Sequence, residues 1–147
     1  FDEELHGTED RDMWIRIARR YKVLRIESPL WRYRIHPASL SHNVLGMKAN
    51  QVKLLHKVFT QYPEFRHRLG LKLVAYSQLH YDTAYMLTET GAGRMRALWH
   101  FVLSFLLRPG PFGSELFGVR FIRLRTLVRC LLGPETFGRV TGRRWKR

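Results

Sequence analysis

Acidic residues and cysteine are scarce in this sequence. Asp and Glu together number 12 against 26 Lys and Arg, which gives a formal net charge of +14. This excess of positive charge predicts attraction to anionic partners, namely nucleic acid, acidic lipid or phosphorylated substrates, without choosing among them. The single cysteine, Cys130, excludes an internal disulfide and suits a reducing compartment. Its apolar neighbours indicate a core position rather than a nucleophile.

Long apolar runs and the commonest catalytic motifs are also missing. The apolar stretch 97–107 is well short of the roughly 20 residues that cross a bilayer, so it is not expected to span a membrane. No His-Glu-x-x-His or close Cys/His cluster supports a zinc site, and no Gly-x-Ser-x-Gly or Walker sequence supports a hydrolase or nucleotide triphosphatase. The chain opens on Phe1 without an initiator Met or signal peptide, so we expect a fragment of a longer enzyme.

Residues 11–21 carry apolar side chains at intervals of three and four, which predicts an amphipathic helix. Trp14 is expected in the core, as is Trp31, rather than as a platform for a sugar ring. Thr8 is the expected N-cap, and the acids that follow it lie in the first turn, where the helix dipole favours negative charge. A carboxylate fixed there, at Asp10, can accept a proton from a hydroxyl. Ordinary helix capping is the alternative, and on this feature alone it is the favoured explanation of the same residues.

Two short strands are predicted next, at 22–27 and 30–36. Successive side chains of a strand point to opposite faces, so Arg32, Arg34 and His36 share one face. Guanidinium groups bind phosphates through two donors, and imidazole binds either phosphate or a divalent metal. This face therefore suits a diphosphate. The alternative is a solvated basic face on an edge strand.

Three segments are informative through their order and spacing, namely FDEEL at 1–5, TEDRDMWIRIA at 8–18 and WRYRIHPASLS at 31–41. Together they resemble the second half of the catalytic domain of family 2 glycosyltransferases. These are GT-A-fold, usually inverting enzymes that use nucleotide-activated sugars. The resemblance covers about residues 1–43. The nucleotide-binding half of the family, with its Asp-x-Asp metal motif, would precede this segment and is not in the chain.

The resemblance implies roles for particular residues. Asp10 takes the position of the catalytic base, and Glu9 beside it shapes the acceptor site. Tyr33, Arg34 and His36 lie near the donor diphosphate, and His36 completes the metal site in some members. A divalent metal, Mg or Mn, would be held mainly by the missing N-terminal half. The fragment alone is expected to be inactive.

The remainder of the chain is predicted to be helical. Helices are expected at 44–61, 64–89 and 94–107, with a helix–helix turn at 91–93. The Pro- and Gly-rich segment 108–113 is the expected linker. Segment 114–147 then forms a basic amphipathic helix and tail, which either lies on an anionic membrane surface or packs on its own domain. The predicted domains are thus 1–43, 44–107 and 114–147.

These patterns predict an α/β remnant followed by a mainly α-helical extension. The resemblance implies that the remnant is the C-terminal half of a GT-A nucleotide-sugar transferase domain. The expected enzyme transfers a sugar from a nucleotide-diphosphate donor to a hydroxyl acceptor, in cell-surface polysaccharide or glycolipid synthesis. It is expected in the cytoplasm, or peripherally on the inner face of the cytoplasmic membrane. The alternative is a basic helical module that binds nucleic acid or a membrane surface without catalysis. The scattered arginines and the lack of a known recognition signature argue against nucleic acid.

Overall fold

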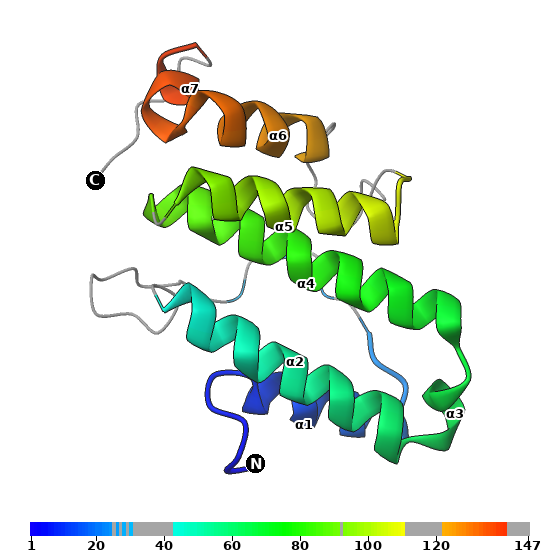
Figure 1. The fold of residues 1–147 in the computed structure, drawn as a ribbon. Helices are drawn as coiled ribbons and strands as arrows, with labels where there is room; N and C mark the ends of the chain where they lie inside the picture. The colour runs from blue at the N-terminus through cyan, green and yellow to red at the C-terminus, as the bar shows by residue number, and fades with distance from the viewer. Residues whose placement is uncertain are drawn as a thin grey trace.

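The computed structural model describes residues 1–24, 26, 28, 30, 43–91, 93–110 and 122–140. Within these residues every regular element is a helix (Figure 1). The helices are α1 (Glu9–Ala18), α2 (Val44–Gln61), α3 (Pro63–Arg66), α4 (Leu69–Thr90), α5 (Arg94–Leu107), α6 (Ile122–Leu132) and α7 (Pro134–Val140). None of these described helices is both long enough and apolar enough to cross a membrane, as predicted for 97–107.

The predicted α/β architecture is wrong, because the described part of the chain is mainly α-helical and contains no strand. The expected strand at 22–27 is not formed at its described positions, and its apolar residues Val23, Leu24 and Ile26 are exposed. A strand needs a neighbour with which to exchange backbone hydrogen bonds, and none of the described residues provides one. The second expected strand, 30–36, lies outside the described residues apart from Leu30.

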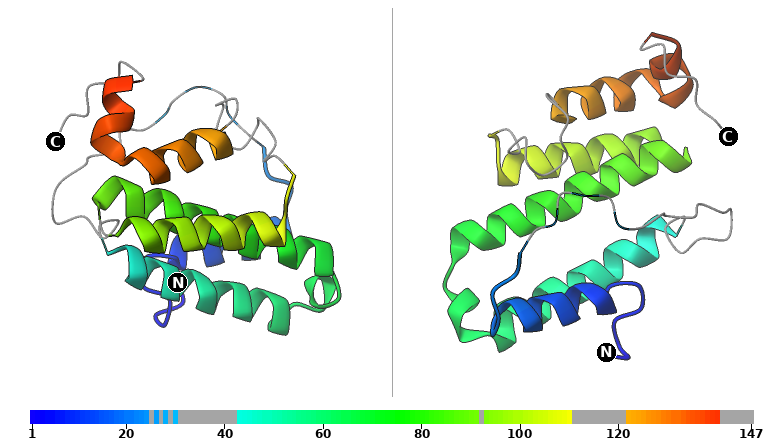
Figure 2. Two further views of the ribbon diagram at one scale, coloured as in Figure 1. Left: turned by 45° about the horizontal axis from the view of Figure 1, so that its top comes forward. Right: turned by 180° about the vertical axis from the view of Figure 1, so that it is seen from behind.

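An antiparallel hairpin of α4 and α5 forms the centre of the molecule (Figure 1). The chain reverses after α4 at Gly91, whose φ of 68° is left-handed and whose N–H donates to the Leu87 carbonyl. Glycine adopts this conformation without a steric penalty, so it ends the helix and starts the turn. The predicted helix–helix turn is confirmed. Figure 2 shows α2 and α1 on one side of the hairpin and α6 with α7 on the other.

Two buried clusters hold the helices together. One joins the N-terminal segment to α2 and consists of Leu5, Leu54, Val58 and Tyr62. The other joins α2, the central hairpin and α6 and consists of Val44, Leu87, Ala97 and Cys130. The predicted core position of Cys130 is confirmed, and burial raises the pKa of its thiol to about 11. A thiol with that pKa is protonated at neutral pH and is a poor nucleophile.

The predicted inward face of α1 is wrong. Trp14 was expected in the core, but it is 57% exposed, and Tyr21 just beyond the helix is also exposed. The residues that turn inward are Thr8 and Asp12, which are fully buried, and Ile15, which packs against the first cluster. A hydrophobicity pattern cannot reveal this orientation, because the buried carboxylate depends on a cation supplied by α2.

Helix α6 packs on the central hairpin through polar contacts. Arg123 donates to the Gly110 carbonyl at 2.6 Å and to Ser77 Oγ at 2.9 Å, and it also bonds the Arg108 carbonyl. Tyr81 and Thr126 share a buried hydroxyl–hydroxyl bond of 2.7 Å. Of the two predicted alternatives for this helix, packing on its own domain is therefore realised in the described residues 122–132.

Candidate functional site

The first turn of α1 presents the two acids assigned to catalysis. Asp10 is exposed, and its Oδ1 accepts a hydrogen bond of 2.7 Å from the Arg11 backbone N–H. Glu9 is half-buried, and its Oε2 is a buried oxygen that accepts no hydrogen bond from the described residues. Thr8 occupies the expected N-cap position, although its side chain makes no capping hydrogen bond. Thus the structure places Glu9 and Asp10 together at the start of one helix.

Asp12, two residues further on, has the opposite environment. It is fully buried, its Oδ1 lies 2.8 Å from Lys57 Nζ on α2, and its Oδ2 lies 3.0 Å from Arg16 Nε. Lys57 Nζ also lies 2.6 Å from Asp2 Oδ2. Burial by itself lowers the pKa of Lys57, but its bonds to Asp12 and Asp2 outweigh this and raise the pKa. These ion pairs fix α1 on α2 and so fix the position of Asp10.

Sequence reasoning treated Asp12 only as one more first-turn acid. Its spacing of four from Arg16 could have suggested an intrahelical pair. Nothing local signals Lys57, which lies 45 positions later. The structural role of Asp12 therefore becomes visible only when the two helices are placed together.

The predicted donor-binding residues, Arg32, Arg34 and His36, lie outside the described residues. Their assignment to the diphosphate, and that of His36 to a metal, stays a prediction. Among the residues that the structure describes, no three His, Cys, Asp or Glu side chains come together in a way that could hold a metal ion. The described part of the chain thus offers no ligand set for Mg or Mn.

A pair of histidines joins α4 to α5. His80 Nδ1 and His100 Nδ1 are 2.9 Å apart, and the rings are stacked with centroids 5.1 Å apart. A hydrogen bond between two ring nitrogens needs one donor and one acceptor, so at least one of the rings is neutral. Burial, together with the positive charge of Lys48 on α2, lowers both pKa values, that of His100 to about 4. The pair therefore acts as a neutral packing contact at physiological pH.

A pocket lies beside α1, between it, α2 and α4. Its volume is about 520 Å³, and Arg11, the residue after Asp10, is among the side chains that line it. Gln78 and Asp82 line it from α4. Sequence reasoning missed this pocket, since Gln78 and Asp82 appear in the sequence as ordinary polar residues of a long helix.

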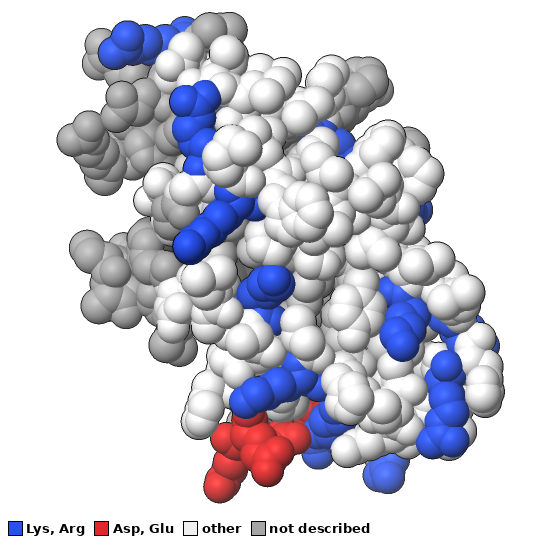
Figure 3. All heavy atoms as spheres, in the orientation of Figure 1, with Lys and Arg blue, Asp and Glu red and all other residues white. Residues whose placement is uncertain are grey.

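The outer face of α5 is an exposed apolar surface. Trp99 is 61% exposed, and it belongs to a row at spacings of four, three and four that also contains Met95, Val102 and Leu106. On α6, Leu124 and Leu131 are exposed as well. Figure 3 shows a broad uncharged area on this side of the molecule, with the acidic side chains gathered near the N-terminal segment.

Comparison with known proteins gives no relative. No protein-family model, no curated protein and no solved structure matches this chain.

Proposed function

We propose that this chain is the C-terminal part of a family 2 glycosyltransferase that uses a nucleotide-diphosphate sugar and a hydroxyl acceptor. Synthesis of cell-surface polysaccharide or glycolipid is the corresponding cellular role. The observation that carries the proposal is the exposed carboxylate of Asp10, at the position that the family resemblance gives to the base. The buried ion pairs of Asp12 support it, because they hold α1 in a fixed orientation while Asp10 stays accessible.

In the proposed reaction Asp10 accepts the proton of the acceptor hydroxyl. The acceptor oxygen forms a bond to the anomeric carbon, and the bond from that carbon to the diphosphate oxygen breaks on the opposite face. The electron pair leaves with the nucleoside diphosphate, and the configuration at the anomeric carbon is inverted. Arg32, Arg34 and His36 would neutralise the charge on the departing diphosphate, because guanidinium and imidazolium donors stabilise such oxyanions.

A base in this role must be ionised and accessible to an acceptor that arrives from solution. The dipole of α1 favours a negative charge at its first turn, where Asp10 lies. Glu9 is the neighbouring carboxylate in the same turn and is half-buried. We assign it to the acceptor side of the site, next to Asp10.

The test is Asp10→Asn in the full-length enzyme that contains this chain. Removing a general base costs about 10²–10⁴ in kcat. We expect that loss while the Kd for the nucleotide-sugar donor, measured by calorimetry, stays within about twofold. The matched control is Glu3→Gln, which changes an exposed acid of the N-terminal segment and should leave kcat unchanged. Near-normal turnover of Asp10→Asn would remove the base assignment and with it the main support for the proposal.

We also propose that the protein lies peripherally on the inner face of the cytoplasmic membrane, with the apolar row of α5 in contact with lipid. Exposed apolar rows of this kind are rare on monomeric soluble proteins and mark interaction surfaces. The net charge of +14 favours a surface of anionic lipid. Nucleic acid is a poorer fit, since Arg123 and Arg129 of α6 are engaged in contacts with the rest of the domain.

A further inference from the structure

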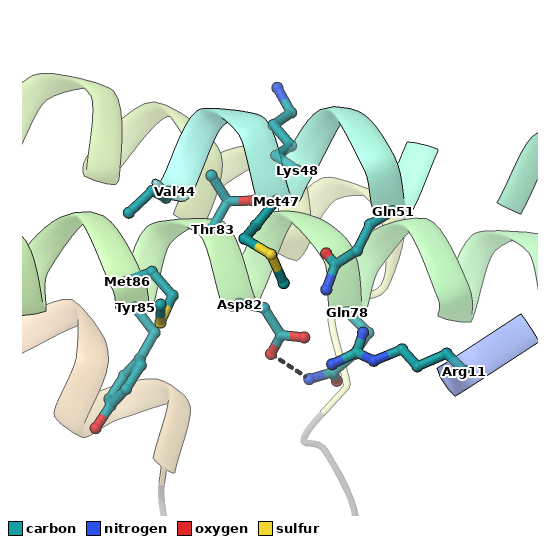
Figure 4. Close-up of a pocket in the computed structure, with 10 residues that line it drawn as sticks. All are labelled: Arg11, Val44, Met47, Lys48, Gln51, Gln78, Asp82, Thr83, Tyr85 and Met86. Atoms are coloured by element: carbon teal, nitrogen blue, oxygen red, sulfur yellow. Dashed lines mark hydrogen bonds between the residues drawn. The ribbon is translucent and has the colours of Figure 1, made fainter. Parts of the chain in front are cut away.

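The pocket between α1, α2 and α4 has a polar end built from three helices. Figure 4 shows the ends of Arg11, Gln51, Gln78 and Asp82 directed toward a common space, while the amine of Lys48 points away from it. The opposite end is lined by apolar side chains, among them Val44 and Met86. A volume of about 520 Å³ falls within the range of sites for small molecules.

The polar groups of this pocket can form more hydrogen bonds than they make to the described residues. Among the described residues, Asp82 Oδ1 accepts one side-chain hydrogen bond, of 2.8 Å, from Gln78 Nε2. A carboxylate has about four lone-pair positions, so Asp82 can accept further bonds. Gln51 makes no side-chain hydrogen bond to the described residues, and its amide both donates and accepts. The pocket therefore offers donors and acceptors side by side.

The charges at the polar end of the pocket are balanced. Arg11 contributes a positive charge and Asp82 a negative one, and the two interact. Lys48 also lines the pocket, but its amine points away from this end. Burial raises the pKa of Asp82, whereas the bond from Gln78 and the charge of Arg11 oppose that rise. A polar end with one charge of each sign does not select an anion. A phosphate or a nucleotide is therefore a poor occupant in spite of the basic character of the chain.

A neutral molecule with several hydroxyls matches this arrangement. Each hydroxyl donates one hydrogen bond and accepts others, so adjacent hydroxyls can bridge an amide, a carboxylate and a guanidinium. The C–H face of a sugar ring can lie against the apolar end of the pocket. We propose that this pocket binds a neutral carbohydrate, and that this carbohydrate is the hydroxyl acceptor. The proposal that this carbohydrate is the acceptor rests on the proposed transferase function. The proposal that the pocket binds a carbohydrate is independent of that function.

The position of the pocket agrees with that role. Arg11 reaches into the pocket from α1, and the preceding residue of the same helix is Asp10. A molecule held by Arg11, Gln51 and Asp82 would thus contact a side chain of the helix that carries Asp10. The ion pair between Asp12 and Lys57 fixes α1 on α2, so the walls of the pocket keep their spacing.

The experiment is a binding measurement on the purified chain. The probes are methyl glycosides of the common hexoses, N-acetylhexosamines and deoxyhexoses, tested by saturation-transfer NMR and then titrated, with inorganic phosphate as the anionic comparison. We expect at least one glycoside to bind and phosphate not to compete with it. Asp82→Asn and Gln51→Leu should each weaken its binding by about tenfold, the effect of losing one strong hydrogen bond. Circular dichroism checks that both variants are folded.

The matched control is Lys48→Met, which changes a residue that lines the same pocket but whose amine points away from the polar end. Its affinity for the glycoside should equal that of the unchanged chain. The proposal is overturned if no glycoside binds, if phosphate competes, or if Asp82→Asn and Gln51→Leu bind as well as Lys48→Met. The transferase proposal is tested separately, by the turnover of the full-length Asp10→Asn enzyme. If that enzyme stays active while the pocket variants lose binding, the pocket stands as a carbohydrate site and its identification as the acceptor site falls.

Discussion

Asp10 and Asp12 are two positions apart on one helix but lie in different environments. Asp10 is exposed and has no ion pair with the described residues, whereas Asp12 is fully buried and contacts two cations. A buried carboxylate is tolerated only when its charge is compensated. Asp12 is therefore a structural residue, and substitutions at these two positions should separate stability from the catalysis proposed for Asp10.

Asp12→Asn removes the negative charge between Lys57 and Arg16. Breaking a buried ion pair from one side typically costs about 3–5 kcal/mol, and the partial exposure of Arg16 places the expected loss near the lower end, at about 3 kcal/mol. Urea unfolding measures this loss as a shift in midpoint. Asp10→Asn is the control and should change the free energy of unfolding by less than about 1 kcal/mol. Equal losses in the two variants would contradict the structural role of Asp12.

At the residue scale the sequence predicted the location of residues better than their orientation. The first-turn location of Glu9 and Asp10 and the core position of Cys130 are confirmed. The inward orientation of Trp14 is wrong, because it was inferred from the apolar side chains of α1 alone. The helix against which α1 packs decides which face of α1 is buried. Here that helix is α2, whose Lys57 forms an ion pair with the Asp12 carboxylate.

At the scale of elements, helices were mostly predicted where they occur and strands were not. The helix expected at 64–89 is interrupted after Arg66 and forms α3 and α4. The bounds expected for 44–61 and 94–107 agree with α2 and α5. Both helices carry their own signal in a local apolar period and a terminating Pro or Gly. A strand cannot be predicted from local sequence in this way, because it forms only when it pairs with a neighbouring strand. The segment 22–27 shows this, since its alternating sequence is not matched by any pairing in the described residues.

The hairpin of α4 and α5 makes stability dependent on pH through His80 and His100. Their pKa values in the folded chain are lowered, that of His100 to about 4, so the unfolded chain binds more protons between about pH 4 and 6.5. Stability should therefore be complete above pH 6.5 and fall as the pH is lowered through that window. The expected loss from the pair is on the order of 2 kcal/mol, measured by denaturant unfolding at pH 7 and pH 5.

The comparison variants are His100→Gln and His56→Gln. Gln at position 100 can still bond His80 but does not titrate, so the fall in stability between pH 7 and pH 5 should become smaller. His56 is exposed on α2, and its replacement should leave the fall unchanged. If His100→Gln loses as much stability on acidification as the unchanged chain, another group is responsible.

At the scale of the whole molecule, charge is distributed unevenly. Six of the twelve acidic residues lie within the first twelve positions. Elsewhere in the described chain, Glu64 and Glu89 are each paired with an arginine, and Asp82 lines the pocket. Among the acidic side chains that the structure describes, most thus lie at the end that contains α1, and Figure 3 shows this gathering on one face.

The proposed membrane contact predicts different effects for two exposed tryptophans. Trp99 on α5 is 61% exposed and Trp14 on α1 is 57% exposed, so replacing each by Ser is the same chemical change at two places. Burying a large apolar side chain is worth about 1.5–3 kcal/mol, so Trp99→Ser should weaken binding to vesicles rich in phosphatidylserine by about tenfold or more. Trp14→Ser should have no effect. Co-sedimentation with anionic and neutral vesicles, at low and high salt, measures both.

Equal binding of the two variants would exclude α5 as the lipid contact. Deleting 114–147 is a poorer test of the membrane proposal, because α6 contributes Cys130 to the core and its loss would expose the central hairpin. Point substitution on outward residues such as Leu124 avoids that problem.

The clustering of acids around α1 gives the molecule a permanent electric dipole. Near a negatively charged sheet of lipid such a dipole feels a torque that turns its negative pole toward the bulk water. The end that bears Asp10 would then face the aqueous phase, from which the proposed nucleotide sugar would arrive, while the exposed row of α5 rests on the bilayer.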